Sequence, residues 1–282
     1  MNNNQLHLFS EDDKVNEYLS SEAKIYTKES LIKALQDIRD KGWVENARPG
    51  NDGGVGNTLE DLLGIKENNL PIPNASEWEL KAQRSKTSSL TTLLHIEPSP
   101  TAFRFVPAIL LPKYGWKHAL AGKNYPITEM SFRQTINGVS RTDRGFGILV
   151  NRAQRRVEVS FDYKAVAKRH AEWLSFVENG VGLVELNPQP YWGFDDLFHA
   201  IGTKLKNCFY VRAQSKRINK VEHFNYSDIM ILSNFSLDKF LTAIEQGNIL
   251  IDFDARTGHN HGTKIRIRQN ILPSLYEITQ SF

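Results

Sequence analysis

The segment Glu77 to Ala82 places acidic and basic side chains in an order that could support hydrolysis. Its residues alternate between polar and apolar types, which predicts a half-buried β-strand. On such a strand Glu79 and Lys81 share one face, with backbones about 6.6–6.8 Å apart. A carboxylate can bind Mg²⁺, which lowers the pKa of a bound water, and a neighbouring ammonium can stabilise the charge of phosphodiester hydrolysis. The short pattern Glu-x-Lys is common, and an exposed strand face with alternating charge is the simpler alternative.

A second carboxylate, Glu60, lies upstream of this strand. A short helix is expected to follow the loop 50–56, with Asn57 as its N-cap and Gly64 at its end. Glu60 could be part of the same site as Glu79. It could equally complete a start that resembles a capping box, with no catalytic role.

Residues 256–268 contain four lysine or arginine side chains and no acidic residue. In the strand expected over 263–268, Ile265 and Ile267 point one way and the basic residues point the other. Arginine and asparagine are suited to reading guanine and adenine in the major groove. A surface hairpin with solvated charges is the alternative. The candidate DNA contacts in this segment are Arg256, His259, Asn260, His261, Lys264, Arg266 and Arg268.

His95 is a further candidate DNA contact. It lies in the segment Leu93–Glu97, which is expected to form the next strand. A lone histidine among apolar residues is more often a hydrogen-bonded core residue, but this one follows the strand of Glu79 and Lys81. The pair His259 and His261 does not predict a metal site, because no third ligand is nearby.

Together these segments resemble the MvaI/BcnI-type restriction endonucleases. These enzymes are relatives of the mismatch-repair nicking enzyme MutH within the PD-(D/E)xK nuclease superfamily. The resemblance covers most of the chain. It rests on the segments Gly56–Glu60, Leu62–Ile65, Glu79–Lys81, Leu205–Arg212, Phe240–Asp252, His261–Thr263 and Leu275–Tyr276.

The resemblance implies a type II restriction endonuclease that hydrolyses duplex DNA at a short specific sequence with Mg²⁺. Glu79 would bind metal, Lys81 would position the nucleophile, and Glu60 would assist as a metal or water ligand. A monomer in the cytoplasm of a prokaryotic cell is expected, with a cognate DNA methyltransferase in the same cell. A strand-nicking enzyme similar to MutH and a catalytically silent DNA-binding protein are the alternatives.

One position departs from the family pattern. The family has an aspartate a few residues before Glu-x-Lys, usually after a proline, whereas this chain has Pro73-Asn74. The carbonyl oxygen of Asn74 can bind a hard cation but supplies no charge. Three explanations are open: a natural variant in which Glu60 or Glu77 supplies the charge, an inactivating replacement, or a protein that binds DNA without cutting it. Asn74 is therefore included as a candidate catalytic and metal-binding residue.

The remaining elements mix helices and strands without regular βαβ alternation, which favours an α/β (α+β) fold on a mixed central sheet. We expect a catalytic lobe over about 25–180, with its active site at 57–95, and a DNA-recognition lobe over about 181–282 as the other wall of a DNA cleft. The patterns predict helices from Thr27 to Gly42, over 165–177, over 194–205 and from Ser236 to Gly247, a hairpin over 147–161 and a strand over 249–253.

Composition excludes several protein classes. Of 282 residues, 40% are hydrophobic and 24% charged, which excludes a disordered chain. The single Cys208 excludes a disulfide framework and a cysteine-bound zinc, and is expected to be a small core residue. No apolar run approaches the roughly 20 residues of a membrane span.

The net charge of +3 is small, but the basic residues are unevenly distributed. They concentrate in residues 133–169, 204–220 and 256–268. These three segments could form one face that binds a polyanion, or they could be solvated faces of separate elements.

Overall fold

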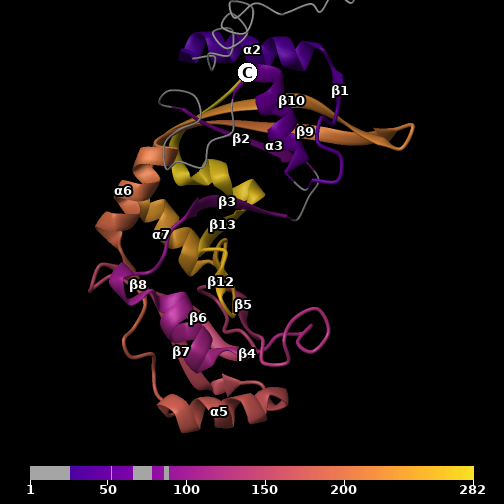
Figure 1. Ribbon diagram of the computed structural model, residues 1–282. Helices are drawn as coiled ribbons and strands as arrows, with labels where there is room; N and C mark the ends of the chain where they lie inside the picture. The colour runs from indigo at the N-terminus through magenta and orange to yellow at the C-terminus, as the bar shows by residue number, and fades with distance from the viewer. Residues whose placement is uncertain (1–25, 52, 66–77, 86–88) are drawn as a thin grey trace, which may run out of the picture.

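The computed structural model of the chain describes residues 26–51, 53–65, 78–85 and 89–282. Three sheets and several helices form a mixed α+β fold, which confirms the expected fold class (Figure 1). The α-helices are α2 (Lys28–Asp40), α3 (Gly54–Leu63), α4 (Leu111–Tyr114), α5 (Ala171–Val181), α6 (Phe194–Leu205) and α7 (Leu237–Glu245).

The first sheet contains the strand with Glu79 and Lys81. Its strand order is β1-β10-β9-β2, and β14 pairs with β10. Strand β2 is parallel to β9, whereas the other pairs are antiparallel. The strands are β1 (Trp43–Glu45), β2 (Glu79–Arg84), β9 (Asn207–Ile218), β10 (Val221–Phe235) and β14 (Tyr276–Ser281).

Helices α2 and α3 pack on one face of this sheet (Figure 1). The side chain of Thr27 caps α2, as predicted, and Gly64 ends α3 with a left-handed backbone. Trp78 and Leu80 point into the core that these helices share with the sheet. Because side chains alternate along a strand, Glu79 and Lys81 point to the opposite face.

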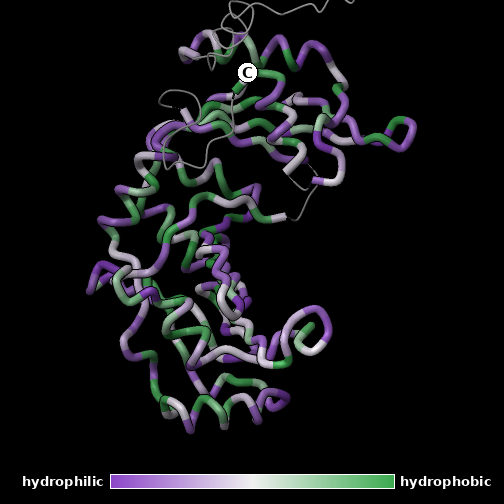
Figure 2. The backbone as a smooth tube through the Cα atoms, viewed as in Figure 1, coloured by the Kyte–Doolittle hydropathy of each residue, from purple (hydrophilic) through white to green (hydrophobic). Residues whose placement is uncertain are grey.

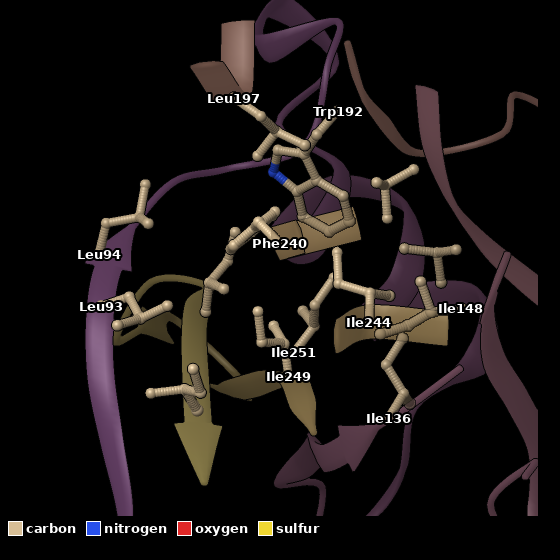
Figure 3. Packing of buried hydrophobic residues seen from close by; sticks show 14 of the residues in the cluster. Leu93, Leu94, Ile136, Ile148, Trp192, Leu197, Phe240, Ile244, Ile249 and Ile251 are labelled. Carbon is tan, nitrogen blue, oxygen red and sulfur yellow. The ribbon is translucent and has the colours of Figure 1, made fainter. Parts of the chain in front are cut away.

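The second and third sheets enclose a larger core with helices α6 and α7 (Figure 3). Strand β11 alternates between buried and partly exposed residues. Figure 2 shows the hydropathy of the residues, which changes between hydrophilic and hydrophobic along the tube. The second sheet has the order β3-β13-β11-β5-β4, with β12 beside β11, and the third has the order β6-β7-β8. The strands are β3 (Leu90–His95), β4 (Trp116–Lys117), β5 (Met130–Ile136), β6 (Arg144–Asn151), β7 (Arg156–Val166), β8 (Tyr191–Gly193), β11 (Ile249–Arg256), β12 (His259–Asn260) and β13 (Lys264–Arg268).

Two predicted helix starts were wrong. Helix α3 begins at Gly54 with Gly53 as its N-cap, so Asn57 lies inside the helix and the capping-box explanation of Glu60 fails. Helix α5 begins at Ala171 rather than at residue 165, because β7 continues to Val166 as part of the third sheet. The helix over 194–205, the helix after Ser236 and the hairpin over 147–161 were predicted correctly. Cys208 is fully buried, as expected.

The expected lobe boundary near residue 180 does not follow the sheets. In the first sheet β2 pairs with β9, and in the second β3 pairs with β13. Each of these sheets therefore combines strands from both sides of that boundary. The chain therefore does not complete the first sheet before it enters the second.

Among the described residues, no helix is long and apolar enough to cross a membrane.

Helix α3 carries Glu60, and we expect the packing of this helix on the sheet to depend on Leu59. This side chain is 0% exposed, so Leu59→Ala should lower the free energy of unfolding by about 2–5 kcal/mol. Leu62 on the same helix is 37% exposed, and Leu62→Ala should cost less than about 1 kcal/mol. Chemical denaturation followed by circular dichroism measures both variants. Equal losses would contradict this orientation of α3.

Candidate functional site

Glu79 and Lys81 lie side by side on the inner face of strand β2, which is the face directed away from helices α2 and α3. They lie opposite Cys208 and Tyr210 of the parallel strand β9. The Lys81 Nζ is 2.6 Å from the Glu79 Oε1, and the two side chains are 18% and 1% exposed. The alternation predicted this juxtaposition. The alternative of an exposed strand face is excluded, because the ion pair is internal.

The Glu79 carboxylate is buried without directional hydrogen bonds. Neither oxygen accepts one of normal geometry from a described residue, so the Lys81 contact is mainly electrostatic. A second ammonium, that of Lys204 on α6, lies 3.9 Å from Oε1. A buried carboxylate is costly unless charges or ligands compensate it. Two cations supply the charge here, both on the side of Oε1, while Oε2 has no partner among the described residues.

Sequence reasoning missed Lys204 as a member of this site. It assigned the residue to a basic segment, because nothing in the local order connects α6 with β2. The packing of α6 beside β3 brings the lysine to Glu79. An acid-free segment around it was the only signal in the sequence.

His95 lies at the end of β3, directly opposite Lys264 of β13. Desolvation lowers the pKa of His95, and repulsion by Lys264, Lys204 and Lys81 lowers it further, while Glu97 opposes this. The imidazole is therefore neutral at pH 7, with one nitrogen able to donate and the other able to accept. Lys81 and Lys204 both lie beside Glu79, and Lys264 lies opposite His95.

Glu60 and Lys81 line one cavity of about 440 Å³ between α3, β2 and β13. Arg84 and Arg266 line the same cavity. Helix α3 begins at Gly54 and packs on the sheet through its buried leucines, which holds Glu60 at the edge of this cavity. The structure therefore brings Glu60, Glu79 and Lys81 to one region, whereas Asn74 and Glu77 lie outside the described residues.

A polar network fixes the end of β2 relative to α3. Arg84 donates to both carboxylate oxygens of Glu222 on β10, at 2.8 and 2.9 Å. This pairing is the main cause of the lowered pKa of Glu222. Asn46 also donates to Glu222 at 3.0 Å, and a Cβ at Gly54 would lie only 2.9 Å from the Asn46 side chain. Glycine therefore allows α3 to approach closely at this point.

Strand β13 carries the predicted cationic face, but carboxylates of β11 compensate part of it. Arg266 donates to Asp252 at 3.3 Å, and Lys264 lies 3.9 Å from Asp254. Arg266 also lines the cavity of Lys81. The cationic face of β13 is therefore continuous with the candidate active site and is not a separate surface. Residues 256–268 contain no acidic residue, but the neighbouring antiparallel strand β11 places Asp252 and Asp254 beside their basic side chains.

The other candidate DNA contacts lie around the turn after β11. His259 and His261 are exposed and stack edge to face, with ring centroids 4.2 Å apart. Asn260 is also exposed and donates to Glu97 at 3.4 Å. The remaining two candidates are engaged elsewhere: Arg256 pairs with Glu129 at 3.0 Å, and Arg268 donates to the carbonyl oxygen of Gly247 at 3.4 Å.

The donor set fits a hard cation in part. Such cations prefer oxygen ligands, and the buried Glu79 carboxylate has two without hydrogen bonds from described residues. Glu60 adds a carboxylate to the adjoining cavity. No group of three or more histidine, cysteine or acidic side chains suited to a metal occurs in the described part of the chain. A complete coordination shell therefore needs further oxygens, from water, DNA or Asn74.

Comparison with known proteins places this geometry in a family. The model of the MvaI/BcnI restriction endonuclease family matches residues 32–276. The chain is similar to restriction endonuclease MvaI in complex with its cognate DNA, with 26% identity and a TM-score of 0.69 over 89% of this chain and 96% of that one. It is also similar to MvaI without DNA, with 24% identity and a TM-score of 0.53 over 98% and 99%. No curated protein matches.

The family match spans α3, β2, β9 and β13, which carry the residues of the site. The fold and the resemblance in the sequence lead to the same assignment. The chain belongs to the MvaI/BcnI restriction endonuclease family.

Proposed function

We propose that the protein is a type II restriction endonuclease that hydrolyses duplex DNA at a short specific sequence, with Mg²⁺ as its cofactor. The observation that carries the proposal is the internal contact between Glu79 and Lys81 on the inner face of β2, beside the cavity lined by Glu60. Family membership and the similarity to a DNA-bound endonuclease support duplex DNA as the substrate.

In this proposal Lys81 acts on the reacting phosphate and water. Its ammonium is fixed by Glu79 and faces the cavity, where it can orient the attacking water and stabilise the negative charge that builds on the phosphate oxygens. Arg266 lines the same cavity, so the surface that we propose below for base recognition begins beside the reacting phosphate. The neutral His95 can hydrogen-bond DNA near the site without adding a charge.

Mg²⁺ would be held by Glu79, with Glu60 and Asn74 as further oxygen ligands. When bound, the cation supplies Lewis-acid polarisation of the phosphodiester. Glu79 is suited to this role because Lys81 and Lys204 offset its charge at Oε1 and leave Oε2 without a partner among the described residues.

For sequence recognition we propose the surface formed by β12, β13 and His95. His261 is exposed at the turn, and Lys264 lies opposite His95. DNA must displace Asp252 and Asp254 from Arg266 and Lys264, or accept these cations with their carboxylates still bound. Paired arginines are held in one orientation, which favours a defined contact over a mobile one. Arg256, His259, Asn260 and Arg268 remain proposed members of this surface.

Asn74 is the observation that favours a second candidate function. A neutral residue at the family's aspartate position removes one charge from the metal site, and such a protein could bind DNA specifically without cutting it. A strand-nicking enzyme is the other proposed alternative. We expect a monomer that works beside a cognate DNA methyltransferase.

Digestion of a defined plasmid with Mg²⁺, followed by sequencing of the ends, separates these functions. A restriction endonuclease yields linear fragments with one repeated end sequence, a nicking enzyme yields open circles, and a silent binder yields neither but shifts the DNA in a gel. If the chain only binds, Asn74→Asp should restore Mg²⁺-dependent cutting. Binding without cutting by that variant as well would exclude the endonuclease.

Lys81→Ala should lower the cleavage rate at saturating DNA by about 10²–10³-fold, the usual loss for one donor to a developing oxyanion. Specific binding should be largely retained, because the interaction strengthens in the transition state. Single-turnover cleavage and a binding titration measure the two effects. The control is Lys41→Ala at the exposed end of α2. Cleavage by the Lys81 variant at the rate of the unmodified protein would remove Lys81 from the reaction.

Chelation with EDTA should abolish cleavage, and Mg²⁺ should restore it. Glu79→Gln keeps the shape of the side chain but removes the charge, so it should weaken Mg²⁺ binding measured by calorimetry on the protein–DNA complex. Undiminished Mg²⁺ binding by Glu79→Gln would show that the cation is held elsewhere.

Lys264→Ala and Arg266→Ala should have separable effects on DNA binding. Loss of a phosphate contact weakens binding to cognate and scrambled duplexes alike and lowers the salt slope by about one. Loss of a bidentate base contact costs about 1–3 kcal/mol and relaxes discrimination at one base pair. We expect the first result for Lys264 and the second for Arg266. If neither variant differs from the parent protein on either duplex, β13 does not read DNA.

A further inference from the structure

The hairpin formed by β9 and β10 continues well beyond the active-site strand. Strand β2 ends at Arg84, opposite Ala213, whereas β9 runs on to Ile218. All residues from 214 to 220 are exposed. Figure 1 shows the hairpin reaching outward on the same side as the segment between β4 and β5. The outer part of the hairpin therefore has no role in the core and is free to contact a partner.

The tip of this hairpin is positively charged. It carries Lys216, Arg217 and Lys220, and none of them forms an ion pair with a carboxylate in the described part of the chain. The Lys216 Nζ lies 4.0 Å from the centroid of the Trp43 ring. Glu222 lies opposite Arg217, but its two oxygens already accept hydrogen bonds from Arg84. Arg217 still acts electrostatically on Glu222. Lys216 and Lys220 have no carboxylate partner among the described residues, and such cations suit an anionic partner.

The turn at the tip holds a lysine in an unfavourable backbone conformation. Ile218 pairs with Val221, so Asn219 and Lys220 form a two-residue loop, and their φ angles are 49° and 70°. Positive φ at both positions is typical of a type I′ turn, whose second position strongly favours glycine. Lysine there is strained, and strain of this kind is commonly retained for function. The turn also fixes the direction of the hairpin, because its twist matches that of the strands.

The reach of the hairpin can be compared with the dimensions of DNA. Tyr210 lies opposite Lys81, and the strand continues for eight residues to Ile218. At 3.2–3.4 Å per residue this is roughly 26 Å. That length exceeds the roughly 12 Å width of the major groove and corresponds to about seven or eight base pairs of B-DNA. If the hairpin runs along the duplex, the tip reaches past the bases that are read next to Lys81.

We propose that the tip of the β9–β10 hairpin binds the DNA backbone outside the recognised sequence, with Lys216 and Lys220 contacting phosphates. The inference rests on the proposed function, because it takes the substrate to be duplex DNA seated at Lys81. The contact adds affinity for any sequence and no discrimination. It extends the bound length of DNA on the side of the active-site sheet.

Lys220→Gly tests this proposal without a folding penalty. Glycine accepts positive φ, so the melting temperature should stay equal or rise, while the cation is lost. The salt slope of DNA binding should fall by about one, and affinity should fall roughly fivefold at 0.15 M salt. The loss should be the same on cognate and scrambled duplexes. Lys220→Arg should retain the parent affinity, because it keeps the charge.

The position of the contact is tested by trimming the DNA. The difference between Lys220→Gly and the parent protein should persist on a long duplex and disappear once the flank on one side is shorter than about seven base pairs. Lys33→Ala is the matched control. Lys33 is an exposed cation on α2, which packs on the face of the sheet opposite to Lys81 and is therefore not expected to contact the DNA.

An unchanged salt slope and affinity for Lys220→Gly on the long duplex would overturn the proposal, and so would a loss that is confined to the cognate sequence. Failure of the proposed function gives a different result, because the parent protein would then show no specific binding and no cutting of DNA.

Discussion

The contact between the Lys81 ammonium and the buried Glu79 carboxylate is the interaction on which the rest of the structure depends. Removing both charges from water is expensive, and a purely structural role would be served as well by apolar residues of similar size. The pair lies instead beside a cavity, with Lys204 as a second cation and with carboxylate oxygens that lack directional hydrogen bonds from described residues. In the proposed function, stability is thereby given up to keep charged groups ready for a cation and a phosphate.

The architecture follows from the need to hold this pair between two sheets. Residues of β2 on one face pack with α2 and α3, and the other face carries the Glu79–Lys81 pair of the proposed active site. Strand β3, which follows β2 in the chain, belongs to the second sheet and pairs with β13, which brings His95, Lys264 and Arg266 to the same region. Consecutive strands of the chain thus carry the proposed site of hydrolysis on β2 and part of the proposed reading surface, His95, on β3.

Local periodicity accounts for what the sequence could predict. The alternation around Glu79 and Lys81 indicated their shared face, and the caps at Thr27 and Ser236 indicated two helix starts. The start of α3 was missed because it depends on close packing between Gly54 and Asn46, which no local pattern encodes. Lys204 and the acids opposite β13 were missed for the same reason. Their partners lie on strands or helices distant in sequence, so only the strand register and helix packing bring them together.

The most direct test of the central claim is the position of a bound cation. Crystals of the protein with a cognate duplex and Mn²⁺, measured at a wavelength where manganese scatters anomalously, would locate the ion without reference to activity. The account predicts an anomalous peak within coordination distance of a Glu79 carboxylate oxygen, on the side of the cavity that Glu60 and Lys81 line. A peak bound elsewhere, with the Glu79 oxygens contacting only Lys81 and Lys204, would contradict it.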